Sequence, residues 1–440
     1  MTLSTQVIAS AFEQRAHGLS DAMRQKARMH IADNVAISVA AREASPLAQI
    51  VRKGCASAAP QGAEYAFAAS AYGHIMDFDD IHDMARVHPT AVNLPAALAV
   101  AGPDTTGAEV VDAVSLSNEL LCRLGAIWKP QGRGPGSDWF LTQLFGYFSG
   151  ALSAGIIMRL DAAQIRSAFG LAYMQAAGGK EAGFGTGSNA RAIYPAFAAM
   201  GGVQAALLAR AGMIGPATAL DGEAGFFRIY FGRHLDADQT RQLLAPTVSV
   251  WADTEVKPWP SCRFSHPFIS AALHLRAGLD LSDIERVTVS VNKSAAKLCS
   301  PIEERRVPQT LQDAKYSIPF MVAFTLVRGE VSLRTLNDAA LSDPAALSMA
   351  QRVNIVDSGT DEAGLPQARI EVQMKSGAVK LFDQAYQAPP GDDAARAKFD
   401  ACFEYAGYAP EETEAAWSGI MDLDRRASQP LQALMAIARK

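Results

Sequence analysis

The chain of 440 residues is long enough for about two or three domains of ordinary size, each with its own core. Its 40 lysines and arginines and 45 aspartates and glutamates give a net charge of −5, which argues against a nucleic-acid-binding protein. Hydrophobic residues make up 49% and charged residues 19%, a composition typical of a globular chain rather than a disordered one.

The sequence predicts neither a membrane span nor a secretion signal. Its longest low-charge stretch, residues 144–158, is interrupted by glycines and is shorter than the roughly 18 apolar residues that a spanning helix needs. Residues 1–14 lack a basic region followed by an apolar block. The five cysteines stand far apart and form no C-x-x-C pair. We therefore expect a cytoplasmic enzyme without membrane or nucleic-acid partners.

The first part of the chain predicts helices. Apolar residues recur at spacings of three and four over 21–41, 62–76, 107–127 and 197–212. Asn93 followed by Pro95 predicts the start of another helix, with Asn93 as its cap. Residues 1–268 are expected to form a large all-helical domain.

The pattern changes after about residue 275. Residues 283–291 alternate like a half-buried strand, and 368–374 with 379–383 predict a hairpin around a short glycine turn. Helices are expected over 313–328, 342–352, 394–405 and 430–438. The predicted fold class is mainly α: the all-helical domain, a smaller α+β lid domain over 269–392, and a helical tail over 393–440 that packs back on the helical domain.

The densest polar cluster lies between residues 74 and 88. It contains His74, Asp77, Asp79, Asp80, His82, Asp83, Arg86 and His88. If a helix runs on through His74, Asp77 and Asp80 share one of its faces. A carboxylate beside a histidine raises the basicity of the ring, which suits proton transfer. A metal site and a solvated acidic loop are the two other interpretations.

Two further segments carry candidate residues. Lys257 stands beside prolines and a tryptophan, where restricted backbone and partial desolvation lower a lysine pKa toward the range of a base. The glycine-rich stretch 178–191 lacks the spacing of a nucleotide-binding loop. It is better interpreted as a loop that brings Lys180 and Arg191 toward an anionic substrate, or as a plain connection. The similar stretch 131–136 is interpreted as structural.

Together these segments resemble the MmgE/PrpD family, which includes 2-methylcitrate dehydratase, cis-aconitate decarboxylase and iminodisuccinate epimerase. The resemblance rests on His74-x-x-Asp77-Phe-Asp79-Asp80 with His88-Pro89, on Lys257-x-x-Pro-x-Cys262-x-x-x-His266, and on the 313–320 run Asp-Ala-Lys-Tyr-Ser-Ile-Pro-Phe. It spans most of the chain. It implies a helical domain with an α+β lid, a homodimer, no metal or other cofactor, and a small polycarboxylate substrate.

The resemblance also implies roles for individual residues. The expected catalytic residues are Asp77, His88 and Lys257. The expected substrate-binding residues are Asp80, His82, Arg86, Arg191, Tyr194 and His266.

Several positions depart from the dehydratase and decarboxylase pattern. Ile81 stands where those enzymes carry threonine, Phe140 where they carry histidine, and Phe320 where the decarboxylase carries tyrosine. Arg191 and Tyr194 replace a lysine and a histidine. Each lost partner would leave a polar substrate group unpaired at about 1–3 kcal/mol. Because epimerisation needs only removal and return of an α-proton, the expected activity is epimerisation of iminodisuccinate.

Three alternatives remain open. The first is a 2-methylcitrate dehydratase-like lyase. The second is a metal-dependent hydrolase with His74, Asp77, Asp80 and His82 as ligands. The third is a catalytically silent protein that binds carboxylates.

Overall fold

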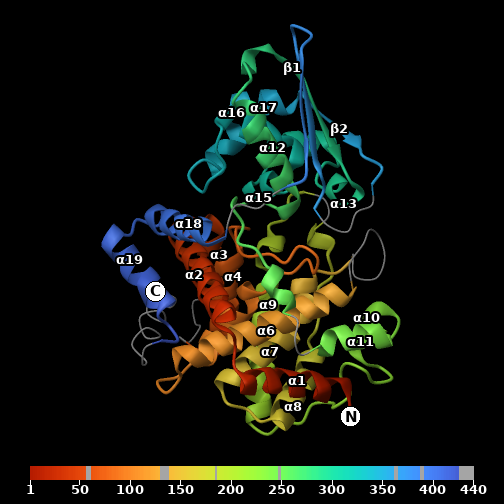
Figure 1. Cartoon of the computed structure of the whole chain (residues 1–440), viewed down its shortest axis with the longest axis vertical. Helices are drawn as coiled ribbons and strands as arrows, with labels where there is room; N and C mark the ends of the chain where they lie inside the picture. The colour runs from red at the N-terminus through yellow and green to blue at the C-terminus, as the bar shows by residue number, and fades with distance from the viewer. Residues whose placement is uncertain are drawn as a thin grey trace.

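The computed structural model describes residues 1–55, 61–128, 138–183, 186–245, 249–360, 365–386 and 391–425. Figure 1 shows a large helical part in the lower half of the view and a smaller part above it that holds the strands. This confirms the predicted mainly α fold with a small α+β domain.

The helical part contains α1 (Leu3–His17), α2 (Asp21–Ala44), α3 (Pro46–Gly54), α4 (Ala63–His74), α5 (Thr90–Val100), α6 (Gly107–Trp128), α7 (Leu141–Ile157), α8 (Ala162–Tyr173), α9 (Tyr194–Arg210), α10 (Phe226–Phe231) and α11 (Ala237–Leu244). The α+β part contains α12 (His266–Arg276), β1 (Ile284–Val291), α13 (Lys293–Ala296), α14 (Ile302–Arg306), α15 (Leu311–Lys315), α16 (Ile318–Arg328), α17 (Pro344–Ala350), β2 (Val353–Asp357), β3 (Ala368–Met374) and β4 (Val379–Gln384). Two tail helices follow, α18 (Gly391–Tyr405) and α19 (Pro410–Met421).

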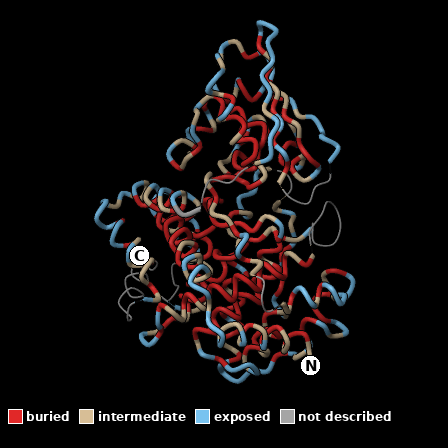
Figure 2. Tube along the Cα trace, viewed as in Figure 1, coloured by how far each residue is buried: buried red, intermediate tan, exposed pale blue. Residues whose placement is uncertain are grey.

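Small residues let the central helices of the helical part approach closely. Where α7 meets α9, a Cβ atom on Gly202 would lie 2.7 Å from the backbone nitrogen of Ala151. A Cβ atom on Gly146 would lie 2.9 Å from the methyl group of Ala198 in the same contact. Figure 2 shows buried residues throughout this interior. The glycines and alanines of these helices therefore serve backbone-to-backbone packing.

Helix α5 begins before the predicted cap, so the prediction of a helix start at Asn93 is wrong. Asn93 lies inside α5, where its side-chain amide donates to Asn118 Oδ1 at 2.9 Å. Pro95 therefore falls in the helix interior, where it has no N–H for the carbonyl of Ala91. The Ser70 hydroxyl on α4 donates to that carbonyl at 2.6 Å. The neighbouring helix thus supplies the hydrogen bond that a proline cannot.

The four strands form one sheet in the order β2-β1-β3-β4. β3 and β4 form the predicted antiparallel hairpin, and Gly377 in its turn has a φ of 85°. β2, which the sequence pattern did not predict, pairs parallel to β1 with Val353 opposite Val287. Alternate residues of β1 and β3 are buried, and helices α12 and α16 join them in a second hydrophobic core.

The single helix expected over 313–328 is divided into α15 and α16. The hydroxyl of Ser317 accepts a hydrogen bond from the Phe320 N–H at 3.1 Å, and Pro319 occupies the first turn of α16. This cap and proline start a new helix. The break leaves Tyr316 between the two helices.

The tail helices pack against the helical part, with Phe399 and Phe403 inside its core. Figure 1 shows α18 beside α2. The predicted domain boundaries at 268/269 and 392/393 stay predictions. The helix expected over 430–438 lies outside the described residues. Among the described residues one helix, Ala190–Arg210, is long and apolar enough to cross a membrane, and 67% of its apolar window is buried inside the protein, as in a core helix.

Candidate active site

A cavity lies where the helical part meets the α+β part. Its lining combines charged, aromatic and apolar side chains from both parts. These are Asp77, Ile81, Asp83, Arg86, His88, Trp139, Phe140, Leu141, Lys180, Arg191, Tyr194, Lys257, Cys262, Arg263, Phe264, Tyr316 and Leu365.

The loop after α4 carries the acidic residues of the cavity floor. α4 ends at His74, and Asp77 has a left-handed backbone with φ of 51°. The expectation that Asp77 and Asp80 share one face of a continued helix is therefore wrong. Non-glycine residues adopt this conformation only where their surroundings hold them in it. Lys257 supplies the restraint, because its Nζ donates to Asp77 Oδ1 at 2.7 Å and to the Asp77 carbonyl at 3.1 Å.

The Asp77–Lys257 pair is buried and charged. Burial alone would raise the pKa of Asp77, but Lys257 and the nearby histidines outweigh burial and hold this pKa at about 2. Asp77 is therefore a carboxylate at any ordinary pH. The pair presents an ammonium and a fixed carboxylate to the cavity.

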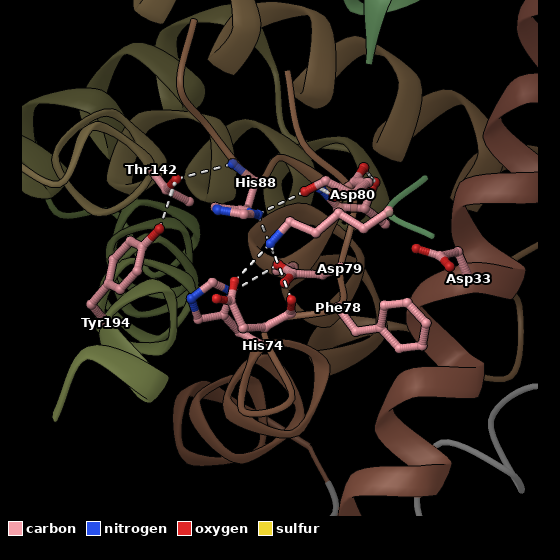
Figure 3. Close-up of polar contacts among 12 residues, drawn as sticks. Asp33, His74, Phe78, Asp79, Asp80, His88, Thr142 and Tyr194 are labelled. Atoms are coloured by element: carbon pink, nitrogen blue, oxygen red, sulfur yellow. Dashed lines mark hydrogen bonds and ion pairs between the residues drawn. The ribbon is translucent and has the colours of Figure 1, made fainter. Parts of the chain in front are cut away.

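Asp79 lies between two histidines, as Figure 3 shows. Its Oδ2 is 2.8 Å from His74 Nδ1 and 3.3 Å from His88 Nδ1. Burial would raise the pKa of Asp79, but the two imidazoles hold it well below its usual value. Burial also lowers the pKa of His74 against the pull of Asp79. The centre of the cluster is thus an ionised aspartate.

The contacts of His88 fix its tautomer. His88 Nδ1 lies 2.7 Å from the carbonyl oxygen of Asp80, which can only accept. In the neutral imidazole, Nδ1 therefore carries the hydrogen and Nε2 holds the lone pair. His88 lines the cavity with 11% of its side chain exposed, and Nε2 is the ring nitrogen left for a ligand.

Aromatic residues form one wall beside His88. The Tyr194 hydroxyl lies 3.4 Å from Thr142 Oγ1, which accepts the backbone N–H of His88 at 3.0 Å. The Tyr194 ring stacks on Phe140 at 4.2 Å. Burial raises the pKa of Tyr194, which keeps its hydroxyl protonated.

Cations also line the cavity. The guanidinium of Arg191 lies 3.5 Å from the ring centre of Tyr316, and Arg191 Nη1 donates to the Gly183 carbonyl at 3.3 Å. Burial, reinforced by the charge of Arg191, lowers the pKa of Lys180 to about 7. Arg86 and Arg263 add positive charge, although Arg263 is paired with Asp83 at 2.7 Å. Such a lining attracts anionic ligands.

The structure brings most of the predicted site residues together, but not all. Asp77, Arg86, His88, Arg191, Tyr194 and Lys257 line the cavity. Asp80, His82 and His266 lie outside its lining.

Each of these three residues has a structural partner instead. Asp80 Oδ2 accepts from His30 Nδ1 at 2.9 Å and from the Thr90 hydroxyl at 2.6 Å. His82 Nε2 lies 2.9 Å from the Val250 carbonyl. His266 Nε2 lies 3.2 Å from the Ser261 carbonyl, and burial lowers its pKa well below the usual value. These contacts place the three residues behind the cavity lining rather than in it.

Tyr316 and Asp79 belong to the site, although the sequence analysis gave neither of them a catalytic or binding role. Both stand in the motifs that carry the resemblance, and their place in these motifs could have identified them. Phe320 does not line the cavity, because it is fully buried against Phe324 in a separate core. Ile81 and Phe140 do line it and make it locally apolar.

The candidate metal ligands are also arranged differently from the expected set. His74, Asp79 and His88 offer atoms within 4.8 Å of one another, whereas Asp80 and His82 are engaged elsewhere. The Nδ1 atoms of both histidines face Asp79, and His88 Nδ1 also faces a carbonyl, so they act as hydrogen-bond donors rather than ligands. The donor set fits two histidine–carboxylate pairs better than a metal shell. The predicted absence of a metal stays a prediction.

Two smaller expectations concern the loops and Cys262. Residues 131–136 and the pair 184–185 lie outside the described residues, while Lys180 and Arg191 do reach the cavity as expected. Cys262 lines the cavity, and burial raises the pKa of its thiol, which disfavours a nucleophile.

Comparison with known proteins gives one family. Residues 6–238 match the MmgE/PrpD N-terminal domain and residues 259–418 the MmgE/PrpD C-terminal domain. The chain is 25% identical over 337 residues to a cis-aconitate decarboxylase of Aspergillus terreus, covering 70% of this chain and 67% of that protein. It is 27% identical over 351 residues to a cis-aconitate decarboxylase-like protein of Aspergillus oryzae, covering 74% and 72%.

Proposed function

The chain belongs to the MmgE/PrpD family of enzymes, and from this premise we propose that it removes and returns an α-proton on a small polycarboxylate without a cofactor, with iminodisuccinate epimerisation as its reaction. The observation that carries the proposal is the hydrogen bond that fixes the tautomer of His88 and leaves Nε2 for a ligand in a cavity lined by cations. At the family level, the decarboxylase relatives support lyase-type chemistry. Epimerisation is the finer part of the proposal.

His88 is the proposed base. Its Nε2 takes the proton from the carbon next to a carboxylate, and the electron pair of the broken C–H bond moves into that carboxylate as an enediolate. Asp79, 3.3 Å from Nδ1, stabilises the imidazolium that results. His88 thus acts as the base, and Asp79 is the carboxylate that stabilises its protonated form.

The cations stabilise the negative charge that develops on the substrate. Arg191 offers a planar fork that can hold a carboxylate through two hydrogen bonds. The ammonium of Lys257 is held by Asp77 at 2.7 Å and needs no reorganisation during the reaction. Electrostatic stabilisation of this kind is commonly the largest contribution to such a reaction.

Inversion requires a second group that delivers a proton from the other side. Lys180 is the proposed acid, because its lowered pKa of about 7 allows it to give up a proton near neutral pH. Its Nζ lies 5.9 Å from the ring centre of Phe140. An ammonium proton of Lys180 passes to the carbanionic carbon, and solvent then restores both groups.

A second candidate is the lyase activity suggested by the names of the relatives. Dehydration also begins with loss of an α-proton, but it needs an acid for the departing hydroxyl. Ile81 and Phe140 place apolar surface on the cavity wall instead, which favours the epimerase.

Proton NMR of the enzyme in D₂O distinguishes these reactions. Iminodisuccinate should gain deuterium at the α-carbon with inversion and without formation of an alkene. Alkene formed from 2-methylcitrate, or carbon dioxide released from cis-aconitate, would establish the lyase and overturn the epimerase. No deuterium exchange with any of the three substrates would contradict both.

A further inference from the structure

Three successive carbonyl groups of the loop after α4 are each held by a buried lysine. The carbonyl oxygens of residues 76, 77 and 78 accept hydrogen bonds from Nζ of Lys315 at 2.7 Å, Lys257 at 3.1 Å and Lys398 at 2.5 Å, respectively. All three lysines are 7% exposed or less. We refer to Lys257, Lys315 and Lys398 as the lysine clamp.

The three lysines come from distant parts of the chain. Lys315 ends α15 in the α+β part, Lys257 lies in the segment before α12, and Lys398 lies on the tail helix α18. Burying an ammonium group costs much free energy unless it is paired. Their common target is therefore a specific arrangement that the fold maintains despite this cost.

The loop that they hold carries the reactive carboxylates. Asp77 has its positive φ there, and Asp79 follows one residue after the last clamped carbonyl. With the carbonyls turned toward the lysines, the carboxylates are directed toward Lys257 and the two histidines. A displacement of this loop would move Asp79 relative to His88.

Lys398 also contacts an acidic residue and an aromatic ring. Besides the Phe78 carbonyl, its ammonium lies 2.6 Å from Asp33 Oδ1 and 3.9 Å from the ring centre of Phe78. Figure 3 shows Asp33 at the right of the labelled cluster, away from His88. Lys398 thus reaches the loop from outside the cavity.

We propose that Lys315 and Lys398 are positioning residues, which hold the loop so that Asp79 and the Asp80 carbonyl keep His88 in its Nδ1–H form. The tail helix is then part of the catalytic apparatus although α18 contributes no residue to the cavity lining described. As far as it concerns turnover, this proposal rests on the proposed function. Its statement about His88 does not.

The test compares Lys398→Met, Asp33→Asn and the double variant Asp33→Asn/Lys398→Met. The double variant removes both buried charges together, so it folds even if Lys398→Met alone leaves Asp33 too costly to bury. Arg396→Met on the same helix is the matched control, because Arg396 pairs with Asp400 and Glu414 away from the loop. Lys315→Met tests the other proposed positioning residue.

Two readouts separate positioning from stability alone. The ¹⁵N shifts of His88 in histidine-labelled protein, assigned with His88→Gln, report its tautomer. Turnover with iminodisuccinate reports catalysis. We expect the double variant and Lys315→Met to lose the Nδ1–H preference and about 10²-fold in kcat with little change in KM. Asp33→Asn and Arg396→Met should keep both properties.

A folded double variant with an unchanged His88 tautomer would overturn the proposal. So would equal losses in Asp33→Asn and the double variant, because Asp33→Asn leaves the bond to the Phe78 carbonyl in place. If the wild type fails to convert iminodisuccinate, the proposed reaction is wrong, and the ¹⁵N measurement still decides the role of the clamp.

Discussion

At the scale of single residues, the site depends on how a few side chains are held rather than on how many are polar. In His88, Nδ1 is hydrogen-bonded to a carbonyl and Nε2 is left for a ligand in the cavity, whereas His82 and His266 use a ring nitrogen to bind a backbone carbonyl. Three histidines near one cavity therefore have different chemistry. The hydrogen bonds decide which of them can act as a base.

Replacing His88 by Gln should abolish most turnover. Glutamine keeps a polar side chain but cannot take up a proton, and general base catalysis contributes about 10²–10⁴-fold. Steady-state kinetics should show the loss in kcat. His234→Gln, at an exposed position, serves as the control. A rate within a few-fold of the wild type would remove His88 from the mechanism.

Lys180 should make stability depend on pH. The folded pKa is lowered to about 7 from 10.5, so between these values the unfolded chain binds a proton that the folded one does not. The contribution of Lys180 to the free energy of unfolding then rises with pH across this window, by at most about 1.4 kcal/mol per pH unit.

Urea unfolding of the wild type and Lys180→Met at pH 7 and pH 9 measures this effect. The free energy of unfolding of the wild type should increase relative to that of Lys180→Met as the pH rises. Lys53→Met, which removes an exposed lysine, should show no such change. A difference that is constant with pH for Lys180→Met would show that this lysine keeps its ordinary pKa.

Much of the site was predictable from the sequence, because its residue types occur at close spacing. The cavity contains Asp77, His88 and Lys257 as expected. The sequence could not show that Asp80 is used by His30, a partner fifty positions away on α2. Nor could it place Tyr316 in the cavity, because that placement depends on the break between α15 and α16.

At the scale of elements, the periodicity of apolar residues located the long helices and the hairpin. It failed where a contact with another element decides the outcome. Pro95 alone indicates a helix start, but the hydrogen bond from Ser70 on α4 to the Ala91 carbonyl allows it to lie inside α5. β2 is short and forms a strand because it pairs with β1, and the sequence of this segment alone does not indicate the pairing.

The Ser70–Pro95 arrangement predicts a double-mutant cycle. Ser70→Ala should lower the free energy of unfolding by about 1–3 kcal/mol, because it leaves the buried carbonyl of Ala91 without a donor. In the background of Pro95→Ala the same change should cost less, since the restored N–H at position 95 can donate to that carbonyl. Urea unfolding measures both costs. Equal costs in the two backgrounds would contradict this account of how Pro95 is accommodated in α5.

At the scale of the whole molecule, two parts with separate cores meet at the cavity. The helical part has its own core, and the sheet with α12 and α16 has another. Arg191 comes from the first part and Tyr316 from the second, and the two are in contact at 3.5 Å. A ligand in the cavity thus touches both parts of the fold. The homodimer implied by the resemblance stays a prediction, which the mass in solution would test.

A polycarboxylate should therefore stabilise the whole molecule. At about 100 times its Kd, a ligand that binds only the folded state adds about 2.7 kcal/mol to the free energy of unfolding. We expect citrate, as a tricarboxylate probe, to raise the unfolding midpoint in urea, and its trimethyl ester to have no effect because it lacks the charges. Arg191→Met should lose most of the citrate effect, since it removes the fork on the cavity wall. Arg210→Met, at the exposed end of the following helix, should keep it. An equal citrate effect in both variants would place the carboxylate site away from Arg191.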